Sequence, residues 1–594
     1  MKRTNYCGSL RPADIGKQVV ISGWVHSRRD HGGVIFVDLR DREGVAQVVF
    51  SPEQKEIFAQ AEKIRSEYVL TVSGLVRVRP EGTKNPNLPT GDVEVATEKL
   101  EIINPSAPLP FEVSDYKETN EDLRLQYRYL DMRRPLMAKN FIFRHKMLQA
   151  VRMFLSNSGF LEIETPTLIK TTPEGAREFL VPSRLNQGHF FALPQSPQIY
   201  KQILMVAGMD KYFQLARCYR DEDLRADRQP EFTQIDMEMS FVDENDVMGV
   251  IEGLLAAIFK EAMGITLKIP FVRLPYGEAM LRFGSDKPDT RFAMEITDLT
   301  EELKNCGFKV FSQAASKGGV IRGLCVKGGE QFSRSKIDEM TKFVANYGAR
   351  GLAWMKVTAK GPESNIVKFF SAGELAAMQK KMGASAGDIL LFLADDASVV
   401  AQGLGALRLS LAKELNMIPK DAYNFLWVVG FPMFEWDKDE KRWNAMHHPF
   451  TAPKVEDQAM LGDDKAMGNI RARAYDVVLN GVELGGGSIR IHTQAVQEKI
   501  FKALRISDED AQEKFGYLLE ALTFGAPPHG GIALGFDRLC ALLLGEESIR
   551  EVIAFPKTQK GTCPLSRAPG IASEKQLREL GIKLRKDEKK INVI

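Results

Sequence analysis

Several features that mark particular classes of protein are scarce in this sequence. Its 594 residues include six cysteines, and no two of them form a CxxC pair. Neither a structural zinc site nor a disulfide framework is therefore predicted. Scattered single cysteines are typical of a reducing compartment, so we expect a cytoplasmic protein without zinc.

Long apolar runs are also missing. No uninterrupted stretch approaches the roughly 20 apolar residues that span a bilayer, and the N-terminal sequence MKRTNYCGSL lacks the apolar core of a signal peptide. Bulk charge of one sign is lacking too, since 80 basic residues nearly balance 78 acidic ones. We expect no membrane partner, and a nucleic-acid partner would need a local basic surface.

Short alternating apolar and polar runs fill the first hundred residues. They occupy residues 18–50 and return at Tyr68–Val78 and Asp92–Ile103. About five strands in this length predict a small antiparallel barrel. The pattern fits an OB-fold, which commonly binds nucleic acid, and it fits other small barrels equally well.

Beyond the barrel, the composition and the pattern of apolar residues change several times along the chain. These changes predict an α+β protein of several domains. Short helices and strands rich in Lys and Gly alternate between about Met294 and Leu415, without a catalytic motif. The predicted order is a barrel (1–105), a linker or hinge (106–140), a first catalytic part (141–290), an inserted α+β domain (291–420), a second catalytic part (421–555) and a C-terminal extension (556–594).

The first catalytic part should open with an amphipathic helix followed by a strand. The helix is predicted by apolar residues along one face, namely Phe143, Met147, Leu148, Val151, Phe154 and Leu155. The sequence FLEIETPTL then predicts the strand. At the other end of the chain, the run RKDEKK is predicted to be a solvated helix or tail.

Residues 211–241 predict two strands joined by a basic, polar loop. One face of the second strand is apolar, with Ile235, Met237, Met239 and Phe241. The other face carries Phe232, Gln234, Asp236 and Glu238. A face this polar is either exposed to solvent or a binding site. Phe232 and the arginines of the loop favour a site, because an aromatic ring can stack on a base and arginine can hold phosphate.

The segment AYDVVLNGVELGGGSIR carries a strong signal for a hairpin turn at Asn480-Gly481. This turn places Asp476 diagonally from Glu483 on one face. Two converging carboxylates suit a magnesium ion that also binds phosphates. Strict alternation would turn Arg490 to the opposite face, whereas a bulge at glycines 485–487 would redirect it.

Two helices are predicted to begin next to polar residues that can bind a ligand. In GIALGFDRLCALLLG, Arg538 falls in the first turn, where a helix N-terminus favours phosphate. In QSPQIYKQILMVAG, Ser196 is expected as the N-cap and Pro197 as the first helical residue. Gln198 and Lys201 then share a face. Ordinary solvated surface is the alternative for both segments.

The order of these segments is more specific than any one of them. FLEIETPTL, YRDED…RQPEF and GIALGFDR resemble motifs 1, 2 and 3 of class II aminoacyl-tRNA synthetases. The N-terminal barrel is similar to that of the aspartyl, asparaginyl and lysyl subgroup. TTPEGAREFLV, QSPQIYKQ, MHHPF and VELGGGSIR resemble the aspartyl family, and the inserted domain and the C-terminal extension resemble its bacterial form. The resemblance covers essentially the whole chain. It implies a six-stranded antiparallel sheet flanked by helices, and a homodimer formed through motif 1, including Pro166.

The resemblance also implies an ATP site served by Mg²⁺. Arg220 would hold the substrate carboxylate and the α-phosphate, Phe232 would stack on adenine, and Arg538 would hold the γ-phosphate. Asp476 and Glu483 would bind the metal. Arg220, Arg538 and Glu483 are thus the expected catalytic residues, without a protein nucleophile. The other expected ATP contacts are Asp221, Glu222, Gln229, Gly535, Phe536 and Asp537.

An aspartate pocket is implied in the same way. Lys201 and Arg490 are candidates for the side-chain carboxylate, so that asparagine would leave two buried cations poorly paired. His447 would close over the substrate. A metal site at His447-His448 is not predicted, because neighbours on a strand point apart and no cysteine lies near. The residues expected around the substrate, besides Arg220, are Glu174, Ser196, Gln198, Gln234 and Asp236.

The barrel should read a tRNA anticodon. Phe36 can stack on a base and Gln47 can hydrogen-bond its edge, although Phe36 within VIFVDL could instead be core. His31 and Gly82 stand where members specific for tRNA(Asp) often carry Leu and Lys, which resembles the form that also charges tRNA(Asn). Further contact positions matching the family are Arg29, Arg79 and Glu94.

Three alternatives stay open. The first is a strictly tRNA(Asp)-specific enzyme. The second is an asparaginyl or lysyl synthetase, which Lys201 together with Arg490 disfavours, since either substrate would leave a cation unmatched. The third is a synthetase-like RNA-binding protein without activity, which the presence of all three motifs disfavours.

Overall fold

A computed structural model describes residues 1–172 and 175–585, so most of the C-terminal RKDEKK run lies outside the described residues. The chain divides into two compact units. The first contains Met1–His145, Asp223–Gln229 and Leu544–Ile571, and the second contains Lys146–Glu222, Pro230–Leu543 and Ala572–Ile594. In the described part, no helix is long and apolar enough to cross a membrane.

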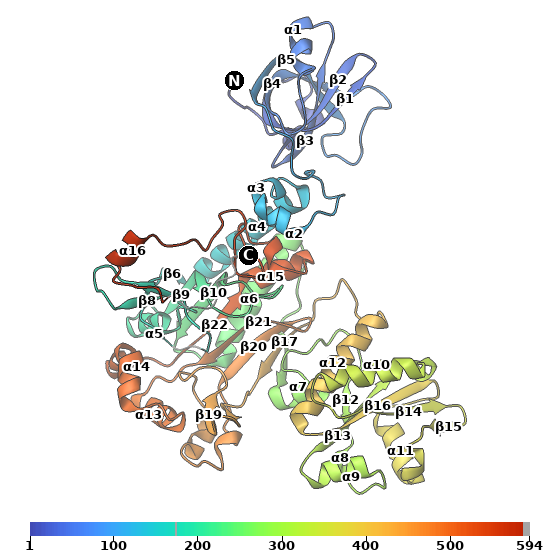
Figure 1. Cartoon of the computed structure of the whole chain (residues 1–594), viewed down its shortest axis with the longest axis vertical. Helices are drawn as coiled ribbons and strands as arrows, with labels where there is room; N and C mark the ends of the chain where they lie inside the picture. The colour runs from blue at the N-terminus through green and yellow to red at the C-terminus, as the bar shows by residue number, and fades with distance from the viewer. Residues whose placement is uncertain (173–174, 586–594) are drawn as a thin grey trace. The chain divides into compact units, whose positions relative to one another are not determined.

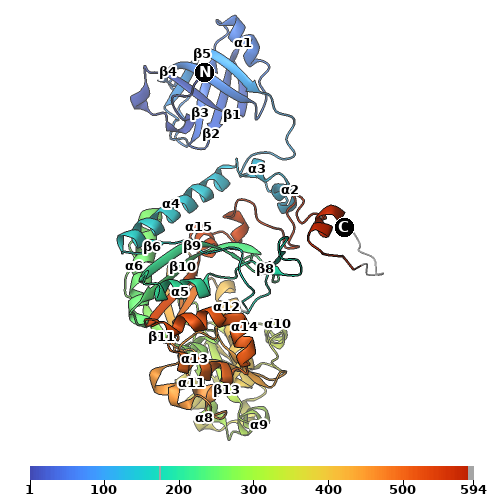
Figure 2. The same cartoon turned by 90° about the vertical axis from the view of Figure 1, so that its left-hand side faces the viewer.

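The N-terminal strands close into a barrel, as the alternating pattern predicts (Figures 1 and 2). Ile35, Val37 and Leu39 alternate into its fully buried core, whereas Phe36 between them is only half-buried. Helix α1 (Lys55–Ala61) follows the third strand. The strands are β1 (Gln18–His31), β2 (Val34–Asp41), β3 (Gly44–Phe50), β4 (Val69–Val78) and β5 (Val93–Asn104), in the closed order β1-β2-β3-β5-β4.

The hinge is more structured than its composition suggests. It contains two short helices, α2 (Glu121–Gln126) and α3 (Arg128–Asp131). Asn120 caps α2 by accepting a hydrogen bond from the backbone N–H of Asp122. The long helix α4 (Pro135–Asn157) follows directly, and Met147, Val151 and Leu155 of its predicted apolar face are fully buried.

The second unit is built on an eight-stranded sheet. Its six central strands are antiparallel, as predicted, while β6 and β11 pair in parallel at the two edges. FLEIETPTL provides only the short strand β6, so that predicted strand was too long. The order is β11 (Val272–Pro275), β17 (Phe425–Val429), β20 (Ala474–Leu479), β21 (Val482–Ile489), β22 (His529–Gly535), β10 (Glu231–Ser240), β9 (Lys211–Tyr219) and β6 (Leu161–Glu162).

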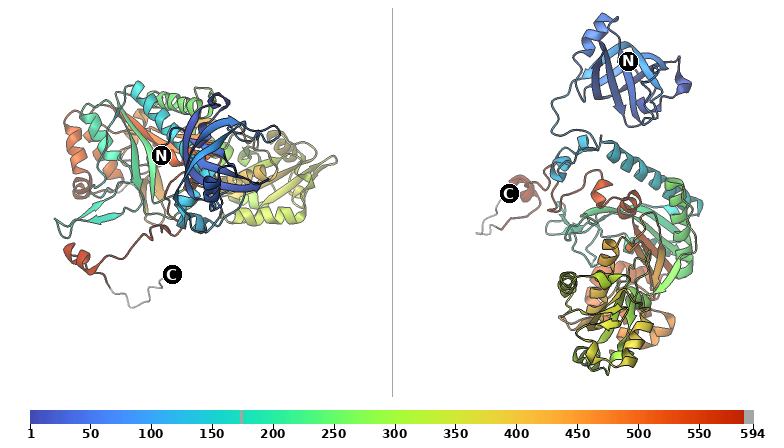
Figure 3. Two further views of the ribbon diagram at one scale, coloured as in Figure 1. Left: turned by 90° about the horizontal axis from the view of Figure 1, so that it is seen from above. Right: turned by 90° about the vertical axis from the view of Figure 1, so that its right-hand side faces the viewer.

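Helices α4, α6 (Glu244–Met263) and α15 (Phe536–Leu544) pack together against the apolar face of this sheet (Figure 3). The Sγ of Cys540 in α15 lies 3.5 Å from the sulfur of Met147 in α4. Fully buried Trp427 of β17 donates to Glu252 of α6 at 2.9 Å, so this carboxylate ties helix to sheet.

The opposite, polar face carries α5 (Gln198–Val206), packed on α14 (Asp508–Thr523). The prediction for α5 was wrong by one residue, because Pro197 occupies the N-cap position and Ser196 precedes it. Smaller elements around the sheet are α7 (Tyr276–Phe283), α13 (Gln494–Ala503), α16 (Glu574–Glu579), the pair β7 (Leu180–Pro182) and β8 (Phe190–Ala192), and the pair β18 (Phe434–Asp437) and β19 (Arg442–Ala445).

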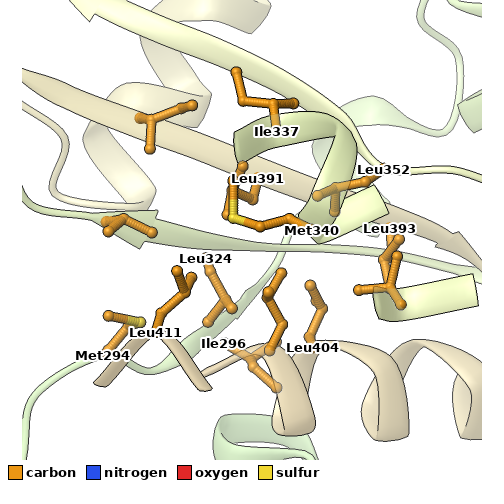
Figure 4. Packing of buried hydrophobic residues seen from close by; sticks show 14 of the residues in the cluster. Met294, Ile296, Leu324, Ile337, Met340, Leu352, Leu391, Leu393, Leu404 and Leu411 are labelled. Atoms are coloured by element: carbon orange, nitrogen blue, oxygen red, sulfur yellow. The ribbon is translucent and has the colours of Figure 1, made fainter. Parts of the chain in front are cut away.

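The inserted segment has its own sheet, in the order β12 (Ile296–Asp298), β13 (Val320–Val326), β16 (Asp388–Asp395), β14 (Ala353–Thr358) and β15 (Gly361–Glu363). Separate hydrophobic clusters lie on its two faces. On one face, α10 (Arg334–Ala345) and α12 (Ala397–Glu414) contribute residues such as Met340 and Leu404, which pack against Leu324 and Leu391 (Figure 4). The other face carries α8 (Thr300–Leu303), α9 (Lys309–Ser316) and α11 (Ala372–Lys381). The inserted segment therefore has a sheet with helices on both faces, and it lies within the second compact unit.

Candidate active site

Strand register brings polar side chains from four strands onto one face of the catalytic sheet. Asp236 of β10 lies opposite Ala533 of β22, Ala533 lies opposite Gly486 of β21, and Gly486 lies opposite Asp476 of β20. Two carboxylates therefore flank a floor made of the two smallest residue types. The face that alternation marked as polar in β10 is the face of a site, which decides against plain solvent exposure.

Glycine is required in this floor because carboxylates lie directly over it. A Cβ on Gly531 would stand 2.0 Å from Oε2 of Glu238 and 2.1 Å from the carbonyl oxygen of Met237. A Cβ on Gly486 would stand 2.4 Å from Oδ1 of Asp476. The glycine-rich stretches of β21 and β22 thus allow acidic side chains to cross the sheet surface.

A β-bulge directs Arg490 into the site. Val477 pairs with Gly485 but Val478 pairs with Glu483, so Leu484 is the additional residue. The bulge lies just before the glycines that were expected to host it. Because one extra residue reverses the alternation, Arg490 shares the face of Glu483.

Four buried charges alternate at the centre of this face. Nζ of Lys201, on α5, lies 2.8 Å from Oδ1 of Asp236 and 3.4 Å from Oε2 of Glu238. Nε of Arg490 lies 2.9 Å from Oε1 of Glu238. All four side chains are at most 2% exposed, so Lys201 is not a surface lysine. Burying four ions is costly, and such clusters are characteristic of functional sites.

The pKa values of the two carboxyl groups shift in opposite directions. Burial raises the pKa of Asp236 more than its ion pair with Lys201 lowers it. Burial also acts on Glu238, but Arg490 and Lys201 together outweigh it and lower the pKa of that carboxyl. Asp236 is therefore the less stabilised of the two anions.

The two histidines of MHHPF lie in the loop after β19 rather than on a strand, so the reason given against a metal site was wrong. Nε2 of His448 lies 2.8 Å from Nη1 of Arg490, which also donates to Oγ of Ser488 at 2.6 Å. Nε2 of His447 lies 4.0 Å from Oδ1 of Asp476. Burial, with a further contribution from Arg490, lowers the pKa of His447 to about 4, so its ring is neutral at pH 7.

Sequence reasoning missed three members of this site, namely Glu238, His448 and Ser488. The alternation in β10 had already put Glu238 on the polar face, although no role was predicted for it. His448 could not be distinguished from the neighbouring His447 by sequence, because both are histidines, and only the contacts in the structure separate them. Ser488 follows the bulge, whose position decides which face it joins.

At the other end of the face, the guanidinium of Arg220 lies 5.2 Å from the ring centroid of Phe232. The backbone N–H of Arg220 donates to the carbonyl oxygen of Pro230, which closes the loop between β9 and β10. Nη1 of Arg538 donates to the backbone oxygen of Glu483 at 2.9 Å. The three motif residues predicted to hold ATP are thus anchored on neighbouring strand ends of one sheet.

The other predicted ATP residues lie in different surroundings. Asp537 accepts a hydrogen bond from the N–H of Thr233 at 2.7 Å, which ties α15 to β10. Phe536 is fully buried. Gln229 belongs to the first unit, where its amide pairs with both backbone groups of Lys557. Asp221 is exposed, Glu222 is half-buried, and Gly535 lies at the end of β22.

Among the residues predicted around aspartate, Gln198 and Gln234 are buried on the site face and Ser196 is half-buried beside them. The Nε2 of Gln198 is buried without a hydrogen-bond partner, and Oε1 of Gln234 accepts from Sγ of Cys218 at 3.2 Å. Glu174 lies outside the described residues.

Asp476 and Glu483 share a face, as predicted, and Asp476 is strained electrostatically. Its Oδ1 is buried without a hydrogen-bond partner. Burial, with repulsion from Glu483 and Asp286, raises its pKa well above the usual value. A divalent cation with oxygen preference would relieve both conditions. No cluster of three or more metal-binding side chains occurs within residues 1–172 and 175–585.

On the barrel, the predicted anticodon residues Arg29, Gln47 and Glu94 belong to a polar network outside the apolar core, in which Gln47 and Glu94 are buried. Nη2 of Arg29 lies 3.0 Å from Oδ1 of Asp38, and Nε2 of Gln47 donates to Oε2 of Glu94 at 2.8 Å. Phe36 lies opposite Arg29 in the strand register, outside the apolar core. Arg79 is buried and donates to the carbonyl oxygen of Val93 at 3.0 Å, while His31 and Gly82 lie exposed at the ends of strands and loops.

Comparison with known proteins identifies the family of the chain. The family described as tRNA synthetases class II (D, K and N) matches residues 120–559, and the OB-fold nucleic acid binding domain family matches residues 19–103. The aspartate–tRNA(Asp/Asn) ligase of Endomicrobium trichonymphae is 63% identical over 98% of this chain and 99% of its own length. This chain belongs to that ligase family. The ligase of the same name from Geotalea uraniireducens is 57% identical over 98% of both chains.

Solved structures show that the family fold is shared more widely. Asparaginyl-tRNA synthetase from Pyrococcus horikoshii, complexed with asparaginyl-adenylate, aligns over 94% of this chain and 98% of its own with a TM-score of 0.58 at 20% identity. Aspartyl tRNA synthetase from Entamoeba histolytica aligns over 93% of this chain and 91% of its own with a TM-score of 0.56 at 19% identity. These matches support the barrel as an OB-fold and the sheet as the class II catalytic fold.

Because the ring of His447 is held neutral, the stability of the folded chain should depend on pH. Its folded pKa of about 4 lies below the ordinary value of 6.5, so between these pH values the unfolded chain binds a proton that the folded chain does not. Folding stability is therefore lost as pH falls from 6.5 toward 4. At pH 5 this loss is about 2 kcal/mol relative to pH 7. His447→Gln should be about that much less sensitive to acid in urea denaturation at the two pH values.

His145→Gln is the matched control, because His145 is exposed on α4. That variant should keep the acid sensitivity of the unmodified chain. Equal acid sensitivity of the His447→Gln variant and this control would show that His447 is not held neutral by its surroundings.

Proposed function

We propose that the chain activates L-aspartate with ATP, forming aspartyl-adenylate and pyrophosphate, and then transfers aspartate to the 3′ end of tRNA(Asp) and tRNA(Asn). The observation that carries the amino-acid choice is the pair of buried cations, Lys201 and Arg490, in one cluster with Asp236 and Glu238. The OB-fold with its polar network supplies a surface for RNA. The high identity to aspartate–tRNA(Asp/Asn) ligases over the full chain supports the same reading.

In the pocket, the side-chain carboxylate of aspartate would join Lys201 and Arg490. The substrate ammonium would be held near Asp236, whose charge the substrate would then stabilise. Arg220 would hold the other carboxylate beside the ribose-linked phosphate. Asparagine has nearly the same shape but no negative side chain, so it would leave both cations without an added partner, which is a large penalty in a buried site.

ATP would lie along the edge where Arg220, Phe232 and Arg538 are anchored. Phe232 offers a ring face for adenine, and the two arginines offer charge to phosphates on either side. Asp476 and Glu483 fit a magnesium ion, which when bound would supply positive charge to the pyrophosphate. The residues act by orientation and electrostatics, since these roles use no side chain as a nucleophile.

We further propose a homodimer formed through motif 1. The large apolar side chains Leu136, Ile142 and Met153 of α4 and Leu161 of β6 are 40–63% exposed. Pro166 follows β6. Large apolar side chains that stay exposed are typical of a protein interface, and a second copy is the partner that the family resemblance favours.

Replacing Lys201 tests the amino-acid pocket. Lys201→Met should abolish aspartate-dependent ATP–pyrophosphate exchange, with a loss of at least about a hundredfold in kcat/KM, because the substrate carboxylate loses one buried cation. Lys211→Met is the control, since Lys211 lies at the far end of β9 and donates to the carbonyl oxygen of Ser158. Thermal melting of both variants checks folding. Near-normal exchange in a folded Lys201→Met protein would remove Lys201 from the pocket.

Charging of purified transcripts tests the tRNA range. Under identical conditions, tRNA(Asp) and tRNA(Asn) should accept aspartate with kcat/KM values within about tenfold, since one relaxed base contact changes affinity by about 1 kcal/mol. This expectation rests on His31 and Gly82, which are exposed and stand where tRNA(Asp)-specific members often carry Leu and Lys. Charging of tRNA(Asp) alone would establish the strictly specific form and keep the synthetase assignment.

A further inference from the structure

The barrel is joined to the hinge through one buried carboxylate. Glu67, just before β4, has a side chain that is 2% exposed. Nη2 of Arg40, in β2, lies 2.7 and 2.9 Å from its two oxygens, and Nη1 of Arg133, in the hinge, lies 2.9 Å from Oε2. The guanidinium of Arg133 also lies 4.8 Å from the ring centroid of Trp24 in β1. A single glutamate thus binds an arginine from each side of the joint.

The backbone of Glu67 is held in an unfavourable conformation to make this contact. Its φ is 63°, in the left-handed region that non-glycine residues rarely adopt. Its N–H donates to the carbonyl oxygen of Val25 at 2.7 Å, which fixes the turn against β1. Strain of this kind persists where surrounding contacts define the position closely, and it is concentrated at functional positions.

The hinge holds a second segment of the first unit just as firmly. Arg128 donates to three backbone carbonyls within residues 550–554, at 2.6 to 3.0 Å. Arg124 lies 2.6 Å from Oε2 of Glu551. The fully buried Asp131 accepts from both arginines. Residues 550–554 follow helix α15, which contains Arg538. The hinge therefore binds the segment that comes directly after this helix.

We propose that the Glu67–Arg133 ion pair is a positioning contact for the transfer of aspartate to tRNA. The inference rests on the proposed function. The strand that Glu67 fixes through Arg40 is the strand that presents Phe36. A barrel that pivots on the hinge would still bind an anticodon but would deliver the 3′ end in many orientations, which slows a reaction that depends on alignment. Adenylate formation needs only aspartate and ATP, so it is independent of this contact.

Arg133→Met is the informative substitution. Methionine keeps apolar contact with Trp24 while it removes the charge. Glu67 retains its ion pair with Arg40, so no buried carboxylate is left unpaired. Substituting Glu67 would instead strand the buried Arg40 and damage the barrel itself.

The matched control is Arg473→Met. Arg473 is one of two cations on Glu244, at 2.6 Å, and Lys454 is the other, at 3.1 Å. The side chains of Arg473 and Arg133 are similarly exposed, at 23% and 27%. The control therefore removes one of two cations from a glutamate in the second unit, away from the joint.

The experiment measures two activities of each full-length protein, namely aspartate-dependent ATP–pyrophosphate exchange without tRNA and steady-state charging of tRNA(Asp). We expect Arg133→Met to keep exchange within about twofold and to lose about ten- to a hundredfold in kcat/KM for charging. Arg473→Met should keep both activities. Arg133→Lys, which keeps the charge, should recover part of the lost charging.

Normal charging by Arg133→Met would overturn the inference, and so would a parallel fall in exchange and charging, which would indicate general damage. Lack of recovery in Arg133→Lys would overturn the role of the charge. If the unmodified chain itself charges no tRNA, the proposed function fails and the inference falls with it. If the unmodified chain charges tRNA and Arg133→Met charges it equally well, the proposed function stands and only the inference about the ion pair fails.

Discussion

The alternation of Lys201, Asp236, Glu238 and Arg490 in one buried cluster is the constraint on which the site depends. Two cations and two anions cancel, so the cluster itself carries no net buried charge. The side-chain carboxylate of aspartate would bring an anion to Lys201 and Arg490, whereas the amide of asparagine would bring no charge. Selection between the two substrates would therefore depend on charge, since their shapes are nearly the same.

The rest of the catalytic sheet serves this cluster. Its side chains reach a common point from α5, from β10 and from the residue after β21, and ordinary side chains on β21 and β22 would stand in the way. Gly486 and Gly531 remove that obstacle, because no Cβ fits beneath the carboxylates above them. The bulge at Leu484 adds the change of face that Arg490 needs. The opposite face is closed by α4, α6 and α15, so the sheet presents one polar surface only.

Much of this arrangement could be predicted from the sequence, because it follows from short-range periodicity. The alternation of apolar and polar residues predicted the two faces of β10, and Asn480-Gly481 predicted the hairpin turn. The pairing of Glu238 with Arg490 joins residues 252 positions apart, and no local pattern encodes it. The predicted position of the bulge and the predicted start of α5 each differ from the structure by one residue. The hinge helices are short and charged, and their stability comes from ion pairs with residues 551 and 67, so composition alone resembled a linker.

The barrel uses polar groups differently from the catalytic sheet. Arg29, Asp38, Gln47 and Glu94 already hydrogen-bond one another outside its apolar core, so reading a base edge exchanges partners and leaves little net cost. Positions 31 and 82 lie outside this network. Gly82 has a φ of +83° and open space around it, which a lysine would enter only with backbone strain. A substitution at either position would therefore leave the hydrogen bonds of this network intact.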